Sequence, residues 1–213
     1  MKGIFFKDFK NAYIPEILEE IYLNRVYEPI LKEKVNTIID VGANIGLTSF
    51  YFSDKAKRVI AVEPSEVHLE VMRHMLKFNK IDNVEIFDRA IYIENKDLTF
   101  YHNENTTMFS LNAAVNSKKD TETVKAITME KLFEDNKINH CDFMKLDVEG
   151  SEGEIIHHSS FEKVAPKIDQ MLIEYHQWCG YNPLNIINTL RDYGFKVDFV
   201  KNVKATLLYA TRK

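Results

Sequence analysis

Three carboxylates lie close together in the stretch L-D-V-E-G-S-E, directly after a short apolar run. They belong to Asp147, Glu149 and Glu152, and Gly150 between them lets the backbone turn. Lys145 lies inside the apolar run, where an unpaired ammonium would be costly to bury. We therefore expect one of the carboxylates to pair with Lys145. Asp147 ends the predicted strand and is expected to face a site beyond it.

Two further polar residues, Glu174 and His176, end the next predicted strand in the sequence I-E-Y-H. Side chains two residues apart in an extended chain point to the same side, so we expect both to face one site. A histidine at the carboxyl end of such a strand is a reasonable general base, and a loop histidine bonded to a neighbour is the alternative. No helical metal site is expected at the adjacent His157 and His158, because they lack the i, i+4 spacing.

A second motif, D-V-G-A-N-I-G, runs from Asp40 to Gly46 after an earlier apolar run. A dinucleotide-binding turn needs G-x-G-x-x-G and a P-loop needs Gly-Lys-Ser/Thr, and neither pattern is present. The turn opens on a carboxylate, which would repel a pyrophosphate and suits a cationic group. S-adenosylmethionine carries an ammonium and a sulfonium and has no phosphate. The alternative is a plain corner between a strand and a helix.

Carboxylates also follow the second and third predicted strands. Glu63 stands in the sequence V-E-P, and an acidic residue at this position can accept hydrogen bonds from both hydroxyls of a ribose. An exposed glutamate at the start of a helix is the alternative. Asp88 follows the third strand, where it could accept from an adenine amino group, with Ala90 beside it. These positions predict a nucleoside site along the ends of the strands.

Short strands alternate with helices along most of the chain, which would place these carboxylates at one edge of a sheet. The predicted strands are 37–41, 58–62, 84–87, 98–101, 123–127, 143–147, 170–175, 196–200 and 205–209. Repeated alternation predicts a parallel sheet with helices on both faces. The last two strands have no helix between them, so one antiparallel strand is expected at or near the sheet edge.

Helices are predicted at 15–28, after Gly46, after Ser65, at 129–136, after Gly150 and, last, from Pro183 to just before Gly194. Ser65 is predicted to cap its helix through its hydroxyl, and Asn182 caps the last one. The polar stretch 102–120 is longer than most connections and is predicted to face the substrate. A surface excursion is the alternative for that stretch.

The composition is that of an ordinary soluble globular protein of 213 residues. The formal net charge of −4 gives no general attraction to nucleic acid or to an anionic membrane. No apolar run approaches the length of a membrane span or a signal peptide, so a cytoplasmic protein is expected. The two cysteines lack metal-binding spacing and are expected to be buried free thiols. We expect a helical appendage at 1–35 and one domain at 36–213.

Together these motifs resemble the FkbM-type family of S-adenosylmethionine-dependent methyltransferases, which belong to class I. The resemblance covers residues 36–178 and is carried by I-I-D-V-G-A-N-I-G, V-E-P, M-K-L-D-V-E-G-S-E and I-E-Y-H. It implies a Rossmann-like fold with a seven-stranded, mostly parallel sheet and an antiparallel last strand. It also implies methyl transfer, commonly to a hydroxyl oxygen of a sugar or another natural product.

The resemblance assigns roles to the residues already singled out. The predicted cofactor-binding residues are Asp40, Gly42, Asn44, Gly46, Glu63, Asp88, Ala90 and Asp147, with the first four at the methionine end. The predicted substrate-binding residues are Glu149, Glu174 and His176. Asp147 and His176 are the candidate catalytic residues, either of which could accept a proton from a hydroxyl. No metal ligand is assigned, although the carboxylate trio leaves a divalent ion open.

The expected partner is a small-molecule acceptor. Three alternatives stay open from the residues alone. The first is another acceptor such as nucleic acid, which the acidic balance disfavours. The second is a nicotinamide oxidoreductase, which the missing G-x-G-x-x-G disfavours. The third is a non-catalytic subunit that binds the cofactor. The chain has little beyond the core to build a substrate domain, so the motifs point to the chemistry more strongly than to the acceptor.

Overall fold

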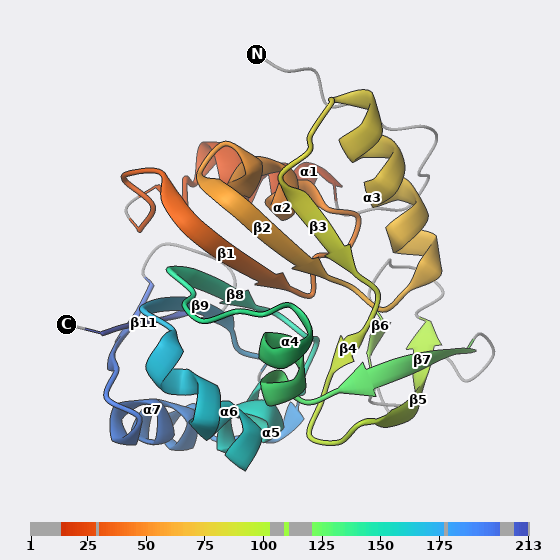
Figure 1. Ribbon diagram of the computed structural model, residues 1–213. Helices are drawn as coiled ribbons and strands as arrows, with labels where there is room; N and C mark the ends of the chain where they lie inside the picture. Colours follow the sequence, from red (N-terminus) through yellow and green to blue (C-terminus); the bar gives the residue numbers. More distant parts are fainter. Residues whose placement is uncertain are drawn as a thin grey trace.

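The computed structural model of the chain describes residues 14–28, 30–102, 109–110, 121–176, 179–200 and 207–212 (Figure 1). Its main layer is a seven-stranded sheet with the order β10-β11-β9-β8-β1-β2-β3. The strands are β1 (Val35–Val41), β2 (Ala56–Val62), β3 (Val84–Phe87), β8 (Phe143–Leu146), β9 (Gln170–Glu174), β10 (Lys196–Phe199) and β11 (Leu207–Thr211). β11 runs opposite to the other six strands and pairs antiparallel with β10 and β9. The predicted fold class is therefore confirmed, with the antiparallel strand one position in from the edge.

The central strands are buried on both faces, as expected for a parallel sheet covered by helices. In β1, Ile39 and Val41 pack into one apolar cluster, and Ile38 packs into the other. In β2, Ile60 faces the first cluster and Val59 the second. This alternation explains why these strands are nearly continuous apolar runs in the sequence.

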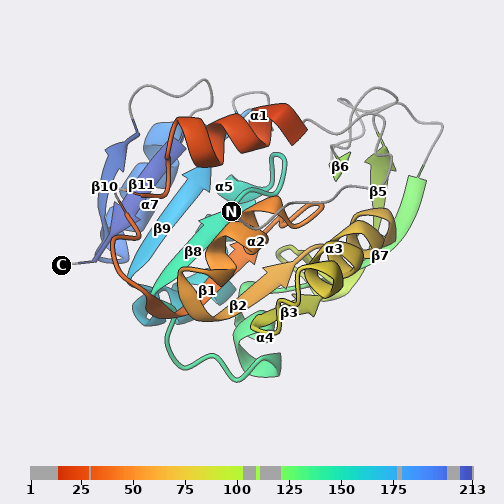
Figure 2. The same ribbon diagram turned by 90° about the horizontal axis from the view of Figure 1, so that it is seen from above.

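Seven α-helices cover the two faces of the sheet among the described residues (Figures 1 and 2). One face carries α1 (Ile14–Leu18), α2 (Leu47–Ser53) and α3 (Glu66–Phe78), and the other carries α4 (Met129–Asp135), α5 (Glu152–His157), α6 (Ser159–Val164) and α7 (Pro183–Asp192). A π-helical turn, η1 (Glu19–Leu23), continues α1, and a 3-10 turn, η2 (Ala165–Lys167), follows α6. Among the described residues, no helix is both long and apolar enough to cross a membrane.

The structure tests four local predictions. The predicted cap of α7 is confirmed, because the Asn182 side chain accepts a hydrogen bond from the Leu184 N–H. The predicted hydroxyl cap at Ser65 is wrong: Ser65 occupies the N-cap position, but its side chain makes no cap hydrogen bond, and Glu122 accepts from the Glu66 N–H instead. The predicted helix at 15–28 was too long, because η1 ends at Leu23 and Arg25 then has a positive φ of 52°. Both cysteines are free as predicted, although Cys179 is only half-buried.

A second, four-stranded sheet lies beside the main one (Figure 1). It contains β4 (Ala90–Ile91), β5 (Lys96–His102), β6 (Phe109–Ser110) and β7 (Thr121–Ile127), in the order β4-β7-β5-β6. The predicted strands at 98–101 and 123–127 pair antiparallel as β5 and β7. The predicted substrate-facing stretch 102–120 lies outside the described residues except at 102, 109 and 110.

The N-terminal segment packs against the face of the sheet that carries α2. Its buried side chains Ile21, Tyr27 and Leu31 join the second apolar cluster. The Tyr27 ring meets the Phe52 ring edge-on, with 5.0 Å between the ring centroids. Figure 2 shows that this packing lays α1 across the tips of β8 and β9. The segment therefore covers the carboxyl edge of the sheet, where the polar motifs end.

The turn after β1 passes against the end of β8. The Asp147 N–H donates to the Val41 carbonyl over 3.1 Å, which joins the two strand ends. A Cβ atom placed on Gly42 would lie 1.6 Å from the Asp147 carbonyl oxygen, and Gly42 has a φ of +79°. Glycine is required here both by the left-handed backbone and by the lack of space.

We predict that Gly42→Ala lowers the free energy of unfolding by about 1–3 kcal/mol more than Gly180→Ala. Gly180 is a matched control, since its φ is +80° and, its chain neighbours aside, no atom of the described residues lies within 4 Å of the Cβ it would gain. Both variants carry the strain of a positive φ, about 1–3 kcal/mol. Urea unfolding of the two variants isolates the clash with Asp147. Equal losses would show that the turn can move away from β8.

Candidate functional site

Two cavities open at the carboxyl ends of the central strands. The donor-side cavity, as we call the first, is lined among others by Gly42, Asn44, Glu63, His68, Ala90, Phe100, Asp147 and Glu149. The N-terminal cavity, the second, lies under α1 and η1 and is lined among others by Ile17, Glu20, Lys145, Asp147, Glu149 and Glu174. Gly42, Asn44, Asp147 and Glu149 line both. The site therefore has two compartments that meet at the end of β8.

Glu63 ties the first turn to the end of β2. Its Oε2 accepts from the Asn44 N–H over 2.9 Å, and its Oε1 accepts from the Ser65 N–H over 3.0 Å. The His68 Nδ1 atom lies 3.1 Å from the same Oε1. The carboxylate is 5% exposed and lines the donor-side cavity. A carboxylate has about four lone-pair positions, so these three contacts leave room for one hydroxyl of a ligand on Oε2.

Asp40 plays a structural part at the start of the turn. It is fully buried, its Oδ2 accepts from the Ser49 hydroxyl over 2.5 Å, and its Oδ1 lies 3.8 Å from Lys145 Nζ. Asn44 has a φ of 52°, which orients its N–H toward Glu63. The turn is thus shaped by side chains below it and presents its backbone to the cavities.

Lys145 is the buried cation of the site, as the sequence predicts. Its Nζ donates to Asp147 Oδ2 over 2.9 Å and to the Gly42 carbonyl over 3.3 Å. Burial disfavours its charge, but Asp147 and Asp40 outweigh that effect and hold the lysine pKa well above its usual range. The other carboxylate oxygen, Asp147 Oδ1, is buried and makes no hydrogen bond with the described residues. Asp147 therefore has one oxygen bonded to Lys145 and one that makes no hydrogen bond with the described residues.

His176 lies among three carboxylates. Its Nδ1 is 3.0 Å from Glu152 Oε1, and its Nε2 is 3.3 Å from Glu149 Oε2 and 4.0 Å from Asp147 Oδ1. Burial opposes protonation of the ring, but the hydrogen bond to Glu152 and the charges of all three carboxylates outweigh it and raise the His176 pKa to about 9. His176 is therefore an imidazolium at neutral pH.

Glu152 organises the turn that follows β8. It is fully buried, and its Oε1 also accepts from the N–H groups of Val148 and Gly150. Glu149 in this turn has a φ of 56°. Burial and the charge of Asp147 raise the Glu149 pKa to about 7. The buried carboxylate of Glu152 thus bonds both to the turn after β8 and to His176.

The same cluster has the composition of a divalent-cation site. Asp147, Glu149 and His176 each offer one ligand atom, and these atoms lie within 4.8 Å of one another. Glu152 would orient the imidazole from behind, as carboxylates do at many metal sites. The three residues could hold an ion if His176 lost its Nε2 proton.

The structure places most of the predicted site residues at the two cavities. Gly42, Asn44, Glu63, Ala90, Asp147 and Glu149 line the donor-side cavity, and Glu174 lines the N-terminal cavity. Asp40, Gly46, Asp88 and His176 are absent from both linings. Gly46 packs against Met72 and Met75, and Asp88 is exposed and pairs with Arg89 over 2.6 Å.

Several lining residues carry no sequence motif. His68 and Phe100 line the donor-side cavity from α3 and β5, and only the packing of the two sheets brings them there. Glu20 lines the N-terminal cavity between Ile17 and Ile21. The sequence does hold an indication for Glu20. Ile17, Glu20 and Ile21 share one face of a helix, so a single carboxylate interrupts an apolar stripe.

Comparison with known proteins connects this geometry to a family. The family model described as the methyltransferase FkbM domain matches residues 40–197. The curated "Probable ribosomal RNA small subunit methyltransferase A" of Methanosphaera stadtmanae is 28% identical over 79 residues, which are 37% of this chain and 29% of that protein. The chain thus spans less than a third of that relative.

Solved structures share the fold at low identity. The structure of methyltransferase FkbM from Methylobacillus flagellatus KT gives a TM-score of 0.57 at 14% identity, covering 83% of this chain and 43% of that one. A Streptococcus mutans protein in complex with SAH also gives a TM-score of 0.57 at 14% identity, covering 91% of this chain and 97% of that one.

We predict that Glu152→Gln lowers the pKa of His176 from about 9 toward its ordinary value, because the neutral amide removes the charge bonded to Nδ1. The folded pKa exceeds the unfolded one, so the stabilisation is full below about pH 6.5 and is lost as pH rises through about 9. The stability gap between wild type and variant should therefore shrink over this range. Imidazole NMR titration and urea unfolding measure both effects.

Glu162→Gln, which changes an exposed carboxylate on α6, is the matched control and should leave the His176 pKa unchanged. A His176 that titrates near 6.5 in wild-type protein would contradict the charge assignment.

Proposed function

Because the chain belongs to the FkbM family of methyltransferases, we propose that it transfers a methyl group from S-adenosylmethionine to a hydroxyl oxygen of a small molecule such as a sugar. The observation that carries this proposal is the position of Asp147 at the junction of the two cavities. One of its oxygens is fixed by Lys145, and the other makes no hydrogen bond with the described residues. Such a carboxylate can take a proton from a group that binds on either side.

The donor-side cavity has the chemistry that S-adenosylmethionine requires. Glu63 keeps acceptor capacity for a ribose hydroxyl, while Ile91, Phe100 and Val148 supply an apolar lining for a nucleobase. The carboxylates of Asp147 and Glu149 supply the negative charge that a sulfonium and an ammonium favour. When bound, S-adenosylmethionine supplies a methyl group on a positively charged sulfur that leaves as a neutral thioether. Asp88 is not among the residues we assign to this cavity.

Asp147 is the residue we assign as the proton acceptor. The hydroxyl of an acceptor bound at the junction would give its proton to the Asp147 carboxylate. Lys145 donates to Asp147 Oδ2 and to the Gly42 carbonyl. It therefore fixes the distance between the Asp147 carboxylate and the turn after β1. His176 is an imidazolium at neutral pH and cannot take that proton. Its charge instead offsets that of Glu149 and Glu152.

The charges that line the two cavities also bear on the three alternative functions. A nucleic-acid acceptor would bring phosphates toward the N-terminal cavity, where the described lining holds four carboxyl groups and one lysine: Glu20, Asp147, Glu149, Glu174 and Lys145. A nicotinamide cofactor would bring its pyrophosphate past the same carboxylates. A non-catalytic binding subunit would use the donor-side cavity but would not need the unbonded oxygen of Asp147. These features favour a methyltransferase with a small, non-anionic acceptor.

We predict that Glu63→Gln weakens binding of the demethylated product S-adenosylhomocysteine by about tenfold to a hundredfold. A hydrogen bond to a charged acceptor contributes about 1.5–3 kcal/mol, and the amide leaves fewer acceptor positions for the ribose. Isothermal titration of wild type and variant measures the loss. The control, Glu66→Gln, changes an exposed carboxylate at the start of α3 and should bind as wild type does. Wild-type protein that binds NAD and not S-adenosylhomocysteine would overturn the proposed function.

We also predict that Asp147→Asn lowers kcat for an accepted hydroxyl compound by about a hundredfold to ten-thousandfold, the usual range for loss of a general base. The amide oxygen can still accept from Lys145, so S-adenosylhomocysteine affinity should change only a few-fold. Production of S-adenosylhomocysteine over time measures kcat. Asp135→Asn, on the exposed side of α4, is the control. A variant with unchanged kcat would move the proton acceptor to another residue.

A further inference from the structure

The N-terminal cavity has a volume of about 210 Å³. Ile17 and Ile21 from the N-terminal segment and Leu47 from α2 form apolar walls. Its polar lining consists of Lys145, Asp147, Glu149 and Glu174 from the ends of β8 and β9, and of Glu20 from η1. The cavity is therefore amphipathic.

Its position relative to the donor-side cavity fits an acceptor. The two cavities share Asp147, whose Oδ1 is buried and makes no hydrogen bond with the described residues. Glu20 and Glu174 line the N-terminal cavity but not the donor-side cavity. A molecule in this cavity could therefore reach Asp147 with one group and the two glutamates with another.

The charge balance of the cavity is strongly negative. Among the described residues, four carboxyl groups line it, and Lys145 is the single cation. The Lys145 ammonium is already bonded to Asp147 and to the Gly42 carbonyl. Within the described ranges, Glu20 and Glu174 make no hydrogen bond or ion pair, although both are at least half-buried. Carboxylates in this position are costly unless a ligand compensates them.

A positively charged group between Glu20 and Glu174 would compensate both carboxylates.

We propose that the N-terminal cavity binds the methyl acceptor, that this acceptor carries a positively charged amino group beside its hydroxyl, and that Glu20 determines this specificity together with Glu174. The inference rests on the proposed function. The hydroxyl meets Asp147 at the junction, the amino group meets the two glutamates, and the carbon skeleton lies against Ile17, Ile21 and Leu47. Amino sugars and amino alcohols have this combination of groups.

The test compares three probes that share one ring: glucosamine, glucose and glucose 6-phosphate. Each is titrated into wild-type protein saturated with S-adenosylhomocysteine, near neutral pH, and ligand-detected NMR measures binding. We expect glucosamine to bind at least tenfold more tightly than glucose, and glucose 6-phosphate to bind most weakly. In Glu20→Gln the preference for glucosamine should fall at least about fivefold, with S-adenosylhomocysteine affinity unchanged.

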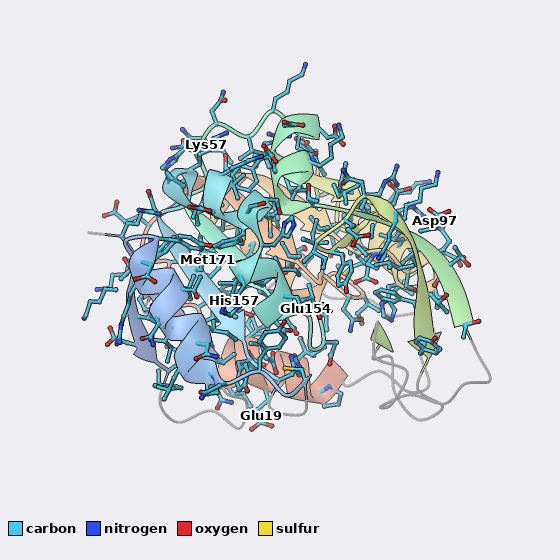
Figure 3. The ribbon with its side chains drawn as sticks, turned by 90° about the horizontal axis from the view of Figure 1, so that it is seen from below. Glu19, Lys57, Asp97, Glu154, His157 and Met171 are labelled. Atoms are coloured by element: carbon cyan, nitrogen blue, oxygen red, sulfur yellow. The ribbon has the colours of Figure 1, made fainter. Side chains whose placement is uncertain are left out.

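Glu19→Gln is the matched control, because Glu19 is the neighbouring residue on the same turn but points outward (Figure 3). It should keep the wild-type preference. Equal binding of glucosamine and glucose, no detectable glucosamine binding, or a Glu20→Gln variant with unchanged preference would overturn the inference. In each of those cases bound S-adenosylhomocysteine shows that the proposed function still stands. Failure to bind S-adenosylhomocysteine would instead remove the proposed function and this inference with it.

Discussion

The ammonium of Lys145 lies where the turn after β1 meets the end of β8, and it contacts both. It donates to Asp147 and to the Gly42 carbonyl and lies 3.8 Å from the buried Asp40. A lysine buried this deeply is tolerated only with such partners. The contacts fix the spacing of the two strand ends, and Gly42 allows the approach because it has no side chain. The position of Asp147 between the two cavities follows from this arrangement.

A second buried charge organises the other half of the site. Glu152 closes the turn after β8 through two backbone N–H groups and holds His176 through Nδ1. The imidazolium then offsets part of the negative charge that Asp147 and Glu149 create. Lys145 and His176 thus each offset part of the negative charge of one acidic cluster. Glu20 and Glu174 add two further carboxyl groups to the N-terminal cavity.

The regular parts of the fold were predictable because they depend on local pattern. The apolar runs of β1, β2 and β8 are buried on both faces, and their bounds agree with the prediction within two residues. The Asn182–Pro183 start of α7 was equally clear. The prediction failed where a tertiary contact replaces a local one: Ser65 does not cap α3, because the carboxylate of Glu122 from β7 takes the N–H of Glu66. The helix at 15–28 ends early because the chain must turn back onto the sheet.

The sequence by itself determined the chemistry at the strand ends. A parallel sheet brings the ends of successive strands to one edge, so the D-V-G-A-N-I-G, V-E-P and D-V-E-G-S-E motifs had to meet there. Their meeting, and the pairing of Lys145 with a carboxylate, follow from spacing and from the cost of burying charge. Only the tertiary structure decided what each carboxylate does. Asp40 is a buried support and Asp88 an exposed partner of Arg89, whereas Glu20, which no motif marks, reaches the site. Side-chain roles depend on which distant segments pack over the edge, and that is set by contacts far apart in the chain.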